Sequence, residues 1–487
     1  MQDFVFPARD EFLNRAADIE RLEDWWSGRD RNALVLYGRR RVGKSWLFRA
    51  FAHGKPTVVL VAERRAEGAQ LARFADRLAP LLGMRPDIGD LPGLIAALYA
   101  LGERQETLAI IDEFPYLLPA RSEQRHETLT AIQAVMEERE SSRLKLMLCG
   151  SHIGQMRALL AQTGPLRGRL TPLSVEPLRF ADAQAFVQES TARARVERYA
   201  LAGGMSMYLD ELARGRGDLR ERVCERVLSH RGPLFNDPRE VLEEELRQPG
   251  IYFSLLEELA LGERAVGDLA TSLGKRTSDL SPYLEMLEKM RLAEKIAPVT
   301  AGRDHRDHRF RLADNFLRFW FRFVFNYQED LRTGLRPEDH YDGEIAPVLS
   351  EHIATIFEGL CREWTRKELG ADASRVGSWW GNALNELRRE GRRQSEEIDI
   401  VGLRRGVVTV VGECKWTGRR MGAQVLKDLE TYKLPAMRQA KVRLASDGPL
   451  IVLFSKSGFE RGLIEIAAER EGVRLVALDE LVAGLMA

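Results

Sequence analysis

The sequence predicts an α/β protein of several domains, and three observations lead to this fold class. The chain has 487 residues, which is more than a single hydrophobic core usually organises. Short apolar runs alternate with helical patterns over the first third of the chain, which is typical of a parallel sheet. The remainder changes to short helices and then back to strands, so separate folded units are expected.

In the first third, four apolar runs have the length of buried strands, and helical periodicity fills the stretches between them. We expect a helix at 10–31, strands at 33–37, 57–62, 107–111 and 144–149, and helices at 44–52, 69–82, 91–101 and 127–139. A mostly helical segment then runs from Pro177 to about residue 245.

Three short amphipathic helices are predicted next, at 251–260, 266–273 and 278–290, and a strand pair follows at 293–299 and 310–312. Three helices and a hairpin are typical of the winged helix, a relative of the helix-turn-helix. The third helix carries Lys289 among several acids and is poorly suited to DNA. The hairpin is better suited to phosphates, because it carries Arg303, Arg306 and Arg309. Contact with DNA and packing against another domain therefore both stay open.

The last part of the chain begins with an aromatic-rich helix around Trp320. From about residue 346 a further helix is expected, and then strands at 397–403, 407–416 and 450–454. A polar turn through Arg404, Arg405 and Gly406 would join the first two of these strands as a hairpin.

Composition excludes several classes of protein. Lys+Arg and Asp+Glu both count 73, so any nucleic-acid binding must come from local patches. The four cysteines form no CxxC pair, which argues against a zinc site or a disulfide framework. No run of 18 apolar residues and no signal-peptide pattern occurs, so we expect a cytoplasmic protein without a membrane partner.

The clearest motif is an octapeptide that fits the pattern GxxxxGK[ST] between a predicted strand and a predicted helix. Glycines let such a loop fold back, so that backbone N–H groups converge on a phosphate at a helix N-terminus. The lysine then reaches the β- and γ-phosphates, and the hydroxyl ligates Mg²⁺. The motif predicts ATP and Mg²⁺ as cofactors, held by Gly38, Arg39, Arg40, Arg41, Val42, Gly43, Lys44 and Ser45.

A second carboxylate-bearing motif follows the strand expected at 107–111. Asp112 comes at the carboxyl end of that strand, where open α/β sheets bind ligands, and would hold Mg²⁺ through water. Glu113 would polarise the attacking water as a general base, although an acid at a helix start is the plainer alternative. The two motifs together predict an ATP hydrolase.

Hydrolysis also needs groups that sense the γ-phosphate and neutralise its charge. Ser151 ends the strand expected at 144–149 and could contact that phosphate, or could be a simple turn serine. Arg167 and Arg169 are candidates for the cation, supplied within the chain or by a neighbouring subunit of a homo-oligomer. Solvated surface arginines are the alternative.

At this point the chain resembles a known family, the prokaryotic AAA+-related ATPases of archaeal type that carry a C-terminal DUF234 domain. The resemblance covers almost the whole chain and rests on residues 12–15, 38–45, 110–114, 150–151, Gly203 and Gly204 before Tyr208, and 311–320. It implies a P-loop ATPase core at 1–175, a helical lid at 176–245, a winged helix at 246–315, an aromatic helical linker at 316–345 and a terminal domain at 346–487. Many relatives read Leu-Tyr-Gly-Arg where this chain reads Leu-Arg-Gly-Arg at 166–169, so the position of the family's arginine favours Arg169.

The terminal domain also resembles the PD-(D/E)XK nuclease core, a restriction-endonuclease-like α/β fold. Glu413 and Lys415 are two apart on one predicted strand and therefore share a face, and Asp399 lies on the strand before it. Two carboxylates can hold Mg²⁺ or Mn²⁺ against a phosphate, with Lys415 orienting water or steadying the developing charge. The resemblance adds Glu358 as the helical acid. A decayed nuclease fold that holds a partner, and a solvated surface pair, remain as alternatives.

Three functional hypotheses follow from these predictions. The first is an ATPase that governs a nuclease-like domain acting on DNA or RNA. The second is a nucleotide-operated regulatory or defence switch whose terminal domain is inert and binds a partner. The third is a regulator that binds DNA through the winged helix.

Overall fold

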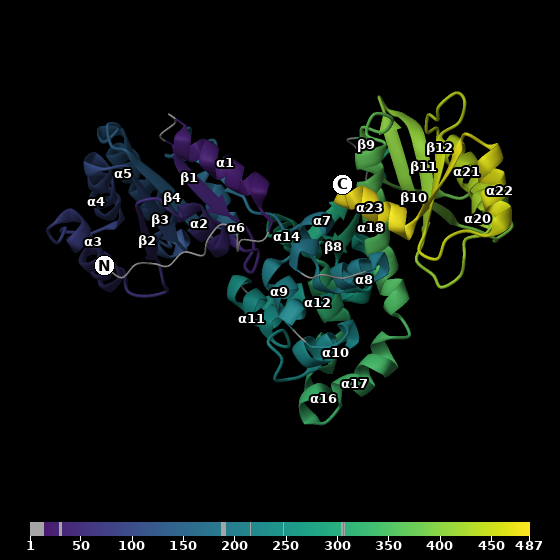
Figure 1. The fold of residues 1–487 in the computed structure, drawn as a ribbon, viewed down its shortest axis with the longest axis horizontal. Helices are drawn as coiled ribbons and strands as arrows, with labels where there is room; N and C mark the ends of the chain where they lie inside the picture. The colour runs from purple at the N-terminus through teal and green to yellow at the C-terminus, as the bar shows by residue number, and fades with distance from the viewer. Residues whose placement is uncertain are drawn as a thin grey trace. The chain divides into compact units, whose positions relative to one another are not determined.

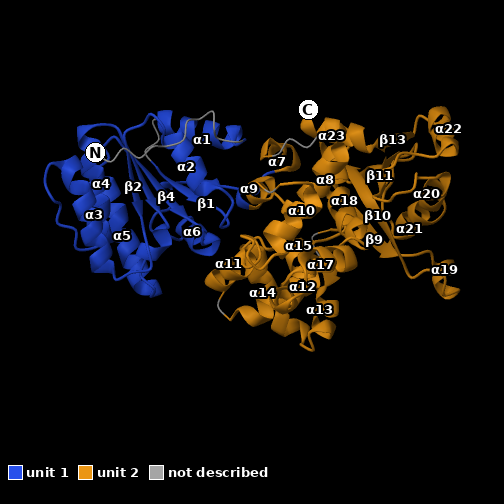
Figure 2. Ribbon diagram, turned by 60° about the horizontal axis from the view of Figure 1, so that its bottom comes forward, with its two compact units in different colours: residues 1–178, 205–207 blue, residues 179–204, 208–487 orange. Residues whose placement is uncertain are grey.

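The computed structural model describes residues 14–28, 32–186, 191–214, 216–246, 248–302, 305 and 307–487. The chain divides into two compact units, which are coloured separately in Figure 2. Unit 1 comprises residues 1–178 with 205–207, and unit 2 comprises residues 179–204 and 208–487. In the described part of the chain, no helix is long and apolar enough to cross a membrane.

Unit 1 is built on a parallel five-stranded sheet with the order β2-β3-β4-β1-β5 (Figure 1). Its first four strands confirm the predicted apolar runs, and their residues are almost all buried because helices cover both faces. The strands are β1 (Ala33–Tyr37), β2 (Thr57–Val61), β3 (Thr107–Asp112), β4 (Leu144–Gly150) and β5 (Leu170–Ser174).

The helices of unit 1 agree with the periodic patterns to within a few residues, apart from the shorter first helix and the earlier start of the fifth. They are α1 (Ala16–Ser27), α2 (Lys44–Ala52), α3 (Glu67–Leu82), α4 (Leu91–Arg104), the 3₁₀ turn η2 (Phe114–Leu117), α5 (Ser122–Glu138) and α6 (Ile153–Leu159). The fifth strand was not predicted, because its Leu-Thr-Pro-Leu-Ser sequence alternates with polar residues and is half exposed. Pro172 is tolerated there since β5 is an edge strand.

Unit 2 begins with the expected mostly helical segment. Its elements are α7 (Phe180–Ala183), η3 (Gln184–Phe186), α8 (Ala192–Ala202), α9 (Ser206–Arg214), α10 (Leu219–Val223), the π-helical turn η4 (Cys224–Leu228) and α11 (Asp237–Glu245). The first two residues of α9 fall within unit 1.

The next segment contains the three predicted helices and the predicted strand pair. They are α12 (Pro249–Ala260), α13 (Val266–Ser272), α14 (Thr277–Lys289), β7 (Ala293–Ile296) and β8 (Arg309–Leu312). A two-residue strand, β6 (Arg264–Ala265), adds to β8, so that a small antiparallel sheet of order β6-β8-β7 forms.

The aromatic-rich helix is α15 (Asn315–Phe323), and it lies in the core of unit 2. Trp320 is fully buried, and its indole N–H donates a hydrogen bond to the Phe235 carbonyl at 2.9 Å. Short helical turns lead from it to the last domain: η5 (Phe325–Tyr327), α16 (Gln328–Thr333), α17 (Pro337–His340) and η6 (Tyr341–Ile345).

The C-terminal part of unit 2 has a mixed sheet of order β13-β12-β11-β10-β9, in which β9 to β11 are antiparallel and β11 to β13 are parallel. The long helix α18 (Leu349–Glu368) packs against β9, β10 and β11 (Figure 1). The strands are β9 (Arg375–Asn382), β10 (Ser395–Arg404), β11 (Val407–Lys415), β12 (Leu450–Ser455) and β13 (Val473–Ala477). The remaining helices are α19 (Asn385–Arg389), α20 (Ala423–Asp428), η7 (Leu429–Lys433), α21 (Leu434–Gln439), α22 (Arg461–Glu469) and α23 (Leu478–Met486).

The hairpin that joins β10 to β11 is the one predicted. Arg404 pairs with Val407, and the two residues between them, Arg405 and Gly406, have φ of 52° and 78°. Two successive positive φ angles are the mark of a tight two-residue turn that matches the strand twist. This turn, together with the register shift between Gly402 and Leu403, sets the pairing that brings the carboxylates of the two strands together.

Candidate functional site

The octapeptide 38–45 consists of the loop 38–43, which connects β1 to α2, and the first two residues of α2. We call residues 38–43 the phosphate loop. Gly43 has φ of 97° and caps the N-terminus of α2, a left-handed conformation that favours glycine. A Cβ on Gly38 would lie 2.4 Å from the Val175 carbonyl oxygen, so a side chain does not fit there either. Both glycines of the motif are therefore required by the backbone itself.

Lys44 lies across this loop. Its Nζ donates hydrogen bonds to the carbonyl oxygens of Gly38 at 2.9 Å and Arg39 at 3.0 Å, and the residue is 7% exposed. The ammonium group is thus held inside the curve of the loop, where a lysine that binds phosphates must reside.

Two acidic residues, Asp112 and Glu113, lie at the carboxyl end of β3 beside the loop. Ser45 Oγ lies 3.5 Å from Asp112 Oδ2, and Asp112 Oδ1 accepts a hydrogen bond from the Glu113 backbone N–H at 3.0 Å. Burial, and secondarily the neighbouring Glu113 charge, raise the pKa of Asp112. A cation between Ser45 and Asp112 would offset both effects, so this pair has the chemistry of a Mg²⁺ site.

Glu113 is joined to the end of the next strand. Ser151 Oγ donates a hydrogen bond to Glu113 Oε1 at 2.9 Å, and the Ser151 backbone N–H approaches Oε2 at 3.4 Å. Glu113 has φ of 52°, an uncommon conformation for a residue with a side chain, and it precedes η2 as its cap. The structure therefore brings Lys44, Ser45, Asp112, Glu113 and Ser151 to one edge of the sheet.

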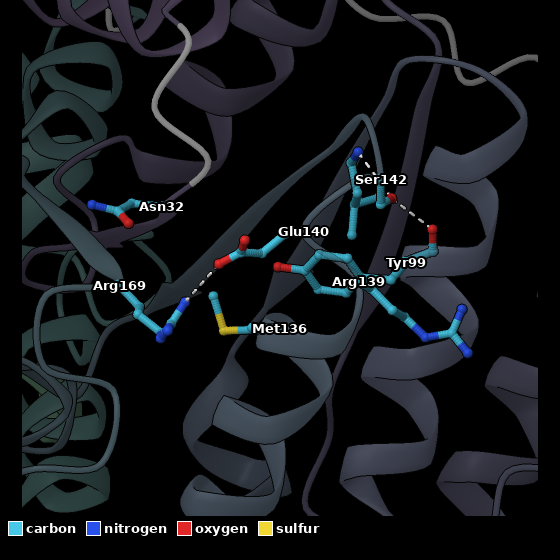
Figure 3. Close-up of a pocket in the computed structure, with 8 residues that line it drawn as sticks. Asn32, Tyr99, Met136, Arg139, Glu140, Ser142 and Arg169 are labelled. Atoms are coloured by element: carbon cyan, nitrogen blue, oxygen red, sulfur yellow. Dashed lines mark hydrogen bonds and ion pairs between the residues drawn. The ribbon is translucent and has the colours of Figure 1, made fainter.

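Arg169 does not reach this edge, and its predicted role within its own chain is wrong. Its carbonyl oxygen accepts the Ala33 backbone N–H at 2.9 Å, at the start of β1, whereas the phosphate loop follows the end of β1. The length of a five-residue strand, roughly 15 Å, separates the two ends. Its guanidinium lies 2.7 Å from Glu137 and 3.9 Å from Glu140, in a pocket of about 310 Å³ (Figure 3). Arg167 is exposed in the same turn.

Three residues from two segments outside the phosphate loop donate hydrogen bonds to its carbonyl groups. Ser206 Oγ donates to the Val42 carbonyl at 3.1 Å, and the Met207 backbone N–H donates to the Arg41 carbonyl at 3.3 Å. Arg15 donates to the same Val42 carbonyl at 2.7 Å and to the Glu176 carbonyl at 2.7 Å. Arg15 belongs to a stretch that carries the family resemblance, but nothing in the sequence marks Ser206.

The C-terminal residues Asp399, Glu413 and Lys415 lie on the paired strands β10 and β11. The register pairs Ile400 with Gly412, which makes Asp399 and Glu413 the next opposed positions on one face. Asp399 Oδ2 accepts the Cys414 backbone N–H at 2.8 Å, and Lys415 Nζ lies 3.6 Å from Glu413.

Lys433, on η7, is a residue of this cluster that the sequence did not suggest. Its Nζ donates a hydrogen bond to Glu413 Oε1 at 2.7 Å, a shorter contact than that of Lys415. Glu413 is 2% exposed, and burial, with a further contribution from Asp399, raises its pKa to about 7. Lys433 lies eighteen positions beyond Lys415, and no local sequence pattern indicates that the fold brings it next to Glu413.

Glu358 lies on α18 near the Asp399 carboxylate. Burial, followed by the nearby Asp399 charge, raises its pKa to about 8. Arg362, one turn further on, lies 3.7 Å from Glu358 and donates to the Asp399 carbonyl oxygen at 3.0 Å. Throughout the described ranges, no three His, Cys, Asp or Glu side chains gather closely enough to hold a metal ion. The cluster is instead balanced by Arg362, Lys415 and Lys433.

The hairpin between β7 and β8 packs within unit 2. The Arg309 guanidinium stacks 4.3 Å from the Trp380 ring centroid and lies 3.5 Å from Glu397. The Val299 backbone N–H donates to the Ser378 carbonyl at 2.9 Å, and the Trp380 indole N–H donates to Asp307 at 2.9 Å. Of the three arginines expected to suit phosphates, Arg309 is committed to this packing, and Arg303 and Arg306 lie outside the described residues.

Two protein-family models match separate parts of this chain. Residues 12–212 match the model of an ATPase domain found predominantly in Archaea, and residues 320–426 match DUF234, described as archaeal and bacterial proteins of unknown function.

Two individual relatives and one solved structure are also similar to this chain. An uncharacterized protein of Methanocaldococcus jannaschii is 25% identical over 80% of this chain and 84% of its own length. An uncharacterized ATP-binding protein of the same organism is 46% identical over 44 residues, which are 9% of this chain and 75% of that protein. A Walker-type ATPase of Pyrococcus abyssi is 21% identical, with a TM-score of 0.49 over 64% of this chain and 97% of that one. The chain therefore carries an ATPase domain of the predominantly archaeal family, followed by a DUF234 domain.

Proposed function

We propose that this chain is a Mg²⁺-dependent ATP hydrolase whose AAA+-like unit 1 controls the rest of the chain. One observation carries the proposal: Lys44, Ser45, Asp112, Glu113 and Ser151 converge at the carboxyl edge of a parallel sheet, beside a loop whose two glycines the backbone requires. This edge is where open α/β sheets bind their ligands.

Each residue has a role that its contacts support. The loop N–H groups and Lys44 would hold the β- and γ-phosphates, and Ser45 with Asp112 would hold the metal. Glu113 would take a proton from the attacking water, and its hydrogen bond to Ser151 fixes the carboxylate for that task. Ser151 would in turn report the presence of the γ-phosphate.

Arg169 keeps one role in this proposal, as a cation supplied to a neighbouring copy of the chain. Arg169 is partly exposed and lies at the end of the sheet where β1 begins, away from the phosphate loop. Both features suit a contact between subunits of a homo-oligomer. Its pairing with Glu137 and Glu140 would have to break for that contact to form.

We also propose the domain boundaries that the resemblance implies: the ATPase core at 1–175, a lid at 176–245, a winged helix at 246–315, a linker at 316–345 and the terminal domain at 346–487. The three helices and antiparallel sheet at 249–312 support the winged helix. Its hairpin packs against Trp380 and Ser378, which favours a structural role for the wing over DNA contact.

For the terminal domain the leading candidate is a restriction-endonuclease-like domain that acts on DNA or RNA with Mg²⁺ or Mn²⁺. Asp399 and Glu413 oppose one another on β10 and β11, Lys415 lies 3.6 Å from Glu413, and Glu358 on α18 is close to Asp399, which supports this candidate. The ion pair of Lys433 with Glu413 at 2.7 Å favours the second candidate, an inert domain that binds a partner. The lysine already pairs with a carboxylate oxygen that would otherwise coordinate a metal ion.

Substitution of Lys415 separates these two candidates. In a catalytic domain we expect Lys415→Ala to lower cleavage by about 10²–10³-fold, the usual effect of removing one group that stabilises the transition state. Metal binding should survive, since the two carboxylates remain. Cleavage of mixed DNA and RNA with Mn²⁺, measured beside calorimetry of Mn²⁺ binding to the nucleotide-free chain, gives both quantities.

Lys427, exposed on α20, provides the matched control, and Lys427→Ala should cleave like the wild type. Asp399→Asn should abolish the calorimetric signal for Mn²⁺. A wild-type chain that neither binds Mn²⁺ nor cleaves would exclude the nuclease and leave the ATPase intact.

The ATPase proposal itself is tested by phosphate release from ATP. Turnover that requires Mg²⁺ supports it, whereas tight nucleotide binding with almost no turnover would favour the nucleotide-operated switch.

A further inference from the structure

Besides Lys44, the carboxyl edge of the unit 1 sheet carries the cationic side chain of Arg40. Arg40 is the third residue of the octapeptide and is half-buried. Its Nη2 donates a hydrogen bond to the Tyr116 hydroxyl at 3.1 Å. Tyr116 follows β3, and its backbone N–H donates to the Glu113 carbonyl at 3.0 Å. Arg40 is thus tied to the same short turn that carries Glu113.

Tyr116 is itself fixed from two neighbouring strands. The Arg64 guanidinium, after β2, lies 5.2 Å from the centroid of the Tyr116 ring. The His152 ring, after β4, meets it edge-on with centroids 5.6 Å apart. His152 follows Ser151, whose hydroxyl donates to Glu113. Consequently the hydroxyl that anchors Arg40 is held in a set position relative to the Glu113 carboxylate.

This arrangement orders the groups around the reacting phosphate. Lys44 lies inside the loop on one side, and Glu113 with Ser151 marks the side from which water would attack. Arg40 extends from the loop toward the turn that carries Glu113, which is the side where the transferred phosphoryl group is expected. Arg169, by contrast, lies at the other end of β1.

We infer that Arg40, positioned by Tyr116, is the cation that stabilises the transferred phosphoryl group of ATP within the same chain. The inference rests on the proposed hydrolysis. In that step the water oxygen bonds to the γ-phosphorus, and the bond from the γ-phosphorus to the bridging oxygen breaks. The electron pair stays on ADP, and the water proton passes to Glu113. Arg40 donates hydrogen bonds to the oxygens on which negative charge increases.

The test compares turnover with binding. We expect Arg40→Ala to lower kcat by about 10²–10³-fold, while the Kd for ATP changes by less than about tenfold, because the contact strengthens only in the transition state. Tyr116→Phe should lower kcat by about tenfold, because it removes the hydroxyl that positions Arg40 but keeps the Arg40 side chain itself. Retained ATP binding shows that each variant is folded.

Two further measurements make the test specific. Guanidinium ions added in solution should restore part of the turnover of Arg40→Ala and none of that of Glu113→Gln. Arg104→Ala, which removes an exposed arginine from the end of α4, should match the wild type.

An Arg40→Ala variant with wild-type kcat would overturn the inference, and so would one that loses only ATP affinity. If the wild type itself released no phosphate, the proposed hydrolysis would fail instead, so the two failures are distinguishable.

Discussion

Lys44→Ala is expected to lower the affinity for ATP by about 100-fold, because it removes charge-assisted hydrogen bonds to two phosphates at the centre of the loop. In the structure Lys44 is 7% exposed, and its ammonium group is held by the Gly38 and Arg39 carbonyls. These carbonyls orient the lysine before nucleotide arrives, so little ordering is required on binding. Nucleotide titration by calorimetry measures the loss.

The matched control for this variant is Lys55→Ala. Lys55 lies just beyond the other end of α2 and pairs with Glu23 at 3.0 Å, so its removal takes away the same charge far from the loop. ATP affinity should stay at the wild-type value in this control. Equal affinity in Lys44→Ala and the wild type would contradict the assignment of the phosphate site.

Glu113→Gln is expected to slow turnover by about 10²–10⁴-fold with ATP binding retained, since a general base contributes on this scale. The amide keeps the shape of the side chain, and its oxygen can still accept the hydrogen bond that Ser151 Oγ donates at 2.9 Å. The substitution therefore removes the ability to take a proton and leaves the geometry of the turn.

Single-turnover phosphate release, measured beside nucleotide binding, separates these two properties for Glu113→Gln. Glu123→Gln, on the exposed first turn of α5, is the control and should turn over normally. If Glu113→Gln hydrolysed ATP at the wild-type rate, Glu113 would be only an anchor for Ser151.

The sequence predicted the parts of the fold in which local pattern and tertiary burial agree. The apolar runs that became β1 to β4 are covered on both faces, so their composition alone identifies them. β5, β9 and β13 were missed, and all three are edge strands. β5, which contains Pro172, and β13 are half-exposed, and β9 includes Gly377, Ser378 and Gly381. Edge strands carry less of the hydrophobic signal by which strands are recognised.

The candidate sites divide in a similar way. Motifs that are contiguous in sequence, such as the octapeptide and Asp112-Glu113, were placed together at the expected edge of the sheet. Contacts between residues that are distant in the sequence were not foreseen. They are the hydrogen bonds of Ser206 to the phosphate loop, of Arg40 to Tyr116 and of Lys433 to Glu413. Arg169 was expected to act within the chain or across a subunit boundary, and its distance from the phosphate loop could not be foreseen, because β5, which begins just after it, was not predicted.

The most direct test of the central claim is steady-state phosphate release by the purified wild-type chain, with Lys44→Ala prepared in the same way. We expect turnover that saturates with ATP, disappears when EDTA removes Mg²⁺, and falls to background in Lys44→Ala. A wild-type rate that equals the Lys44→Ala rate, or that is unchanged by EDTA, would contradict the claim that this loop binds and hydrolyses MgATP.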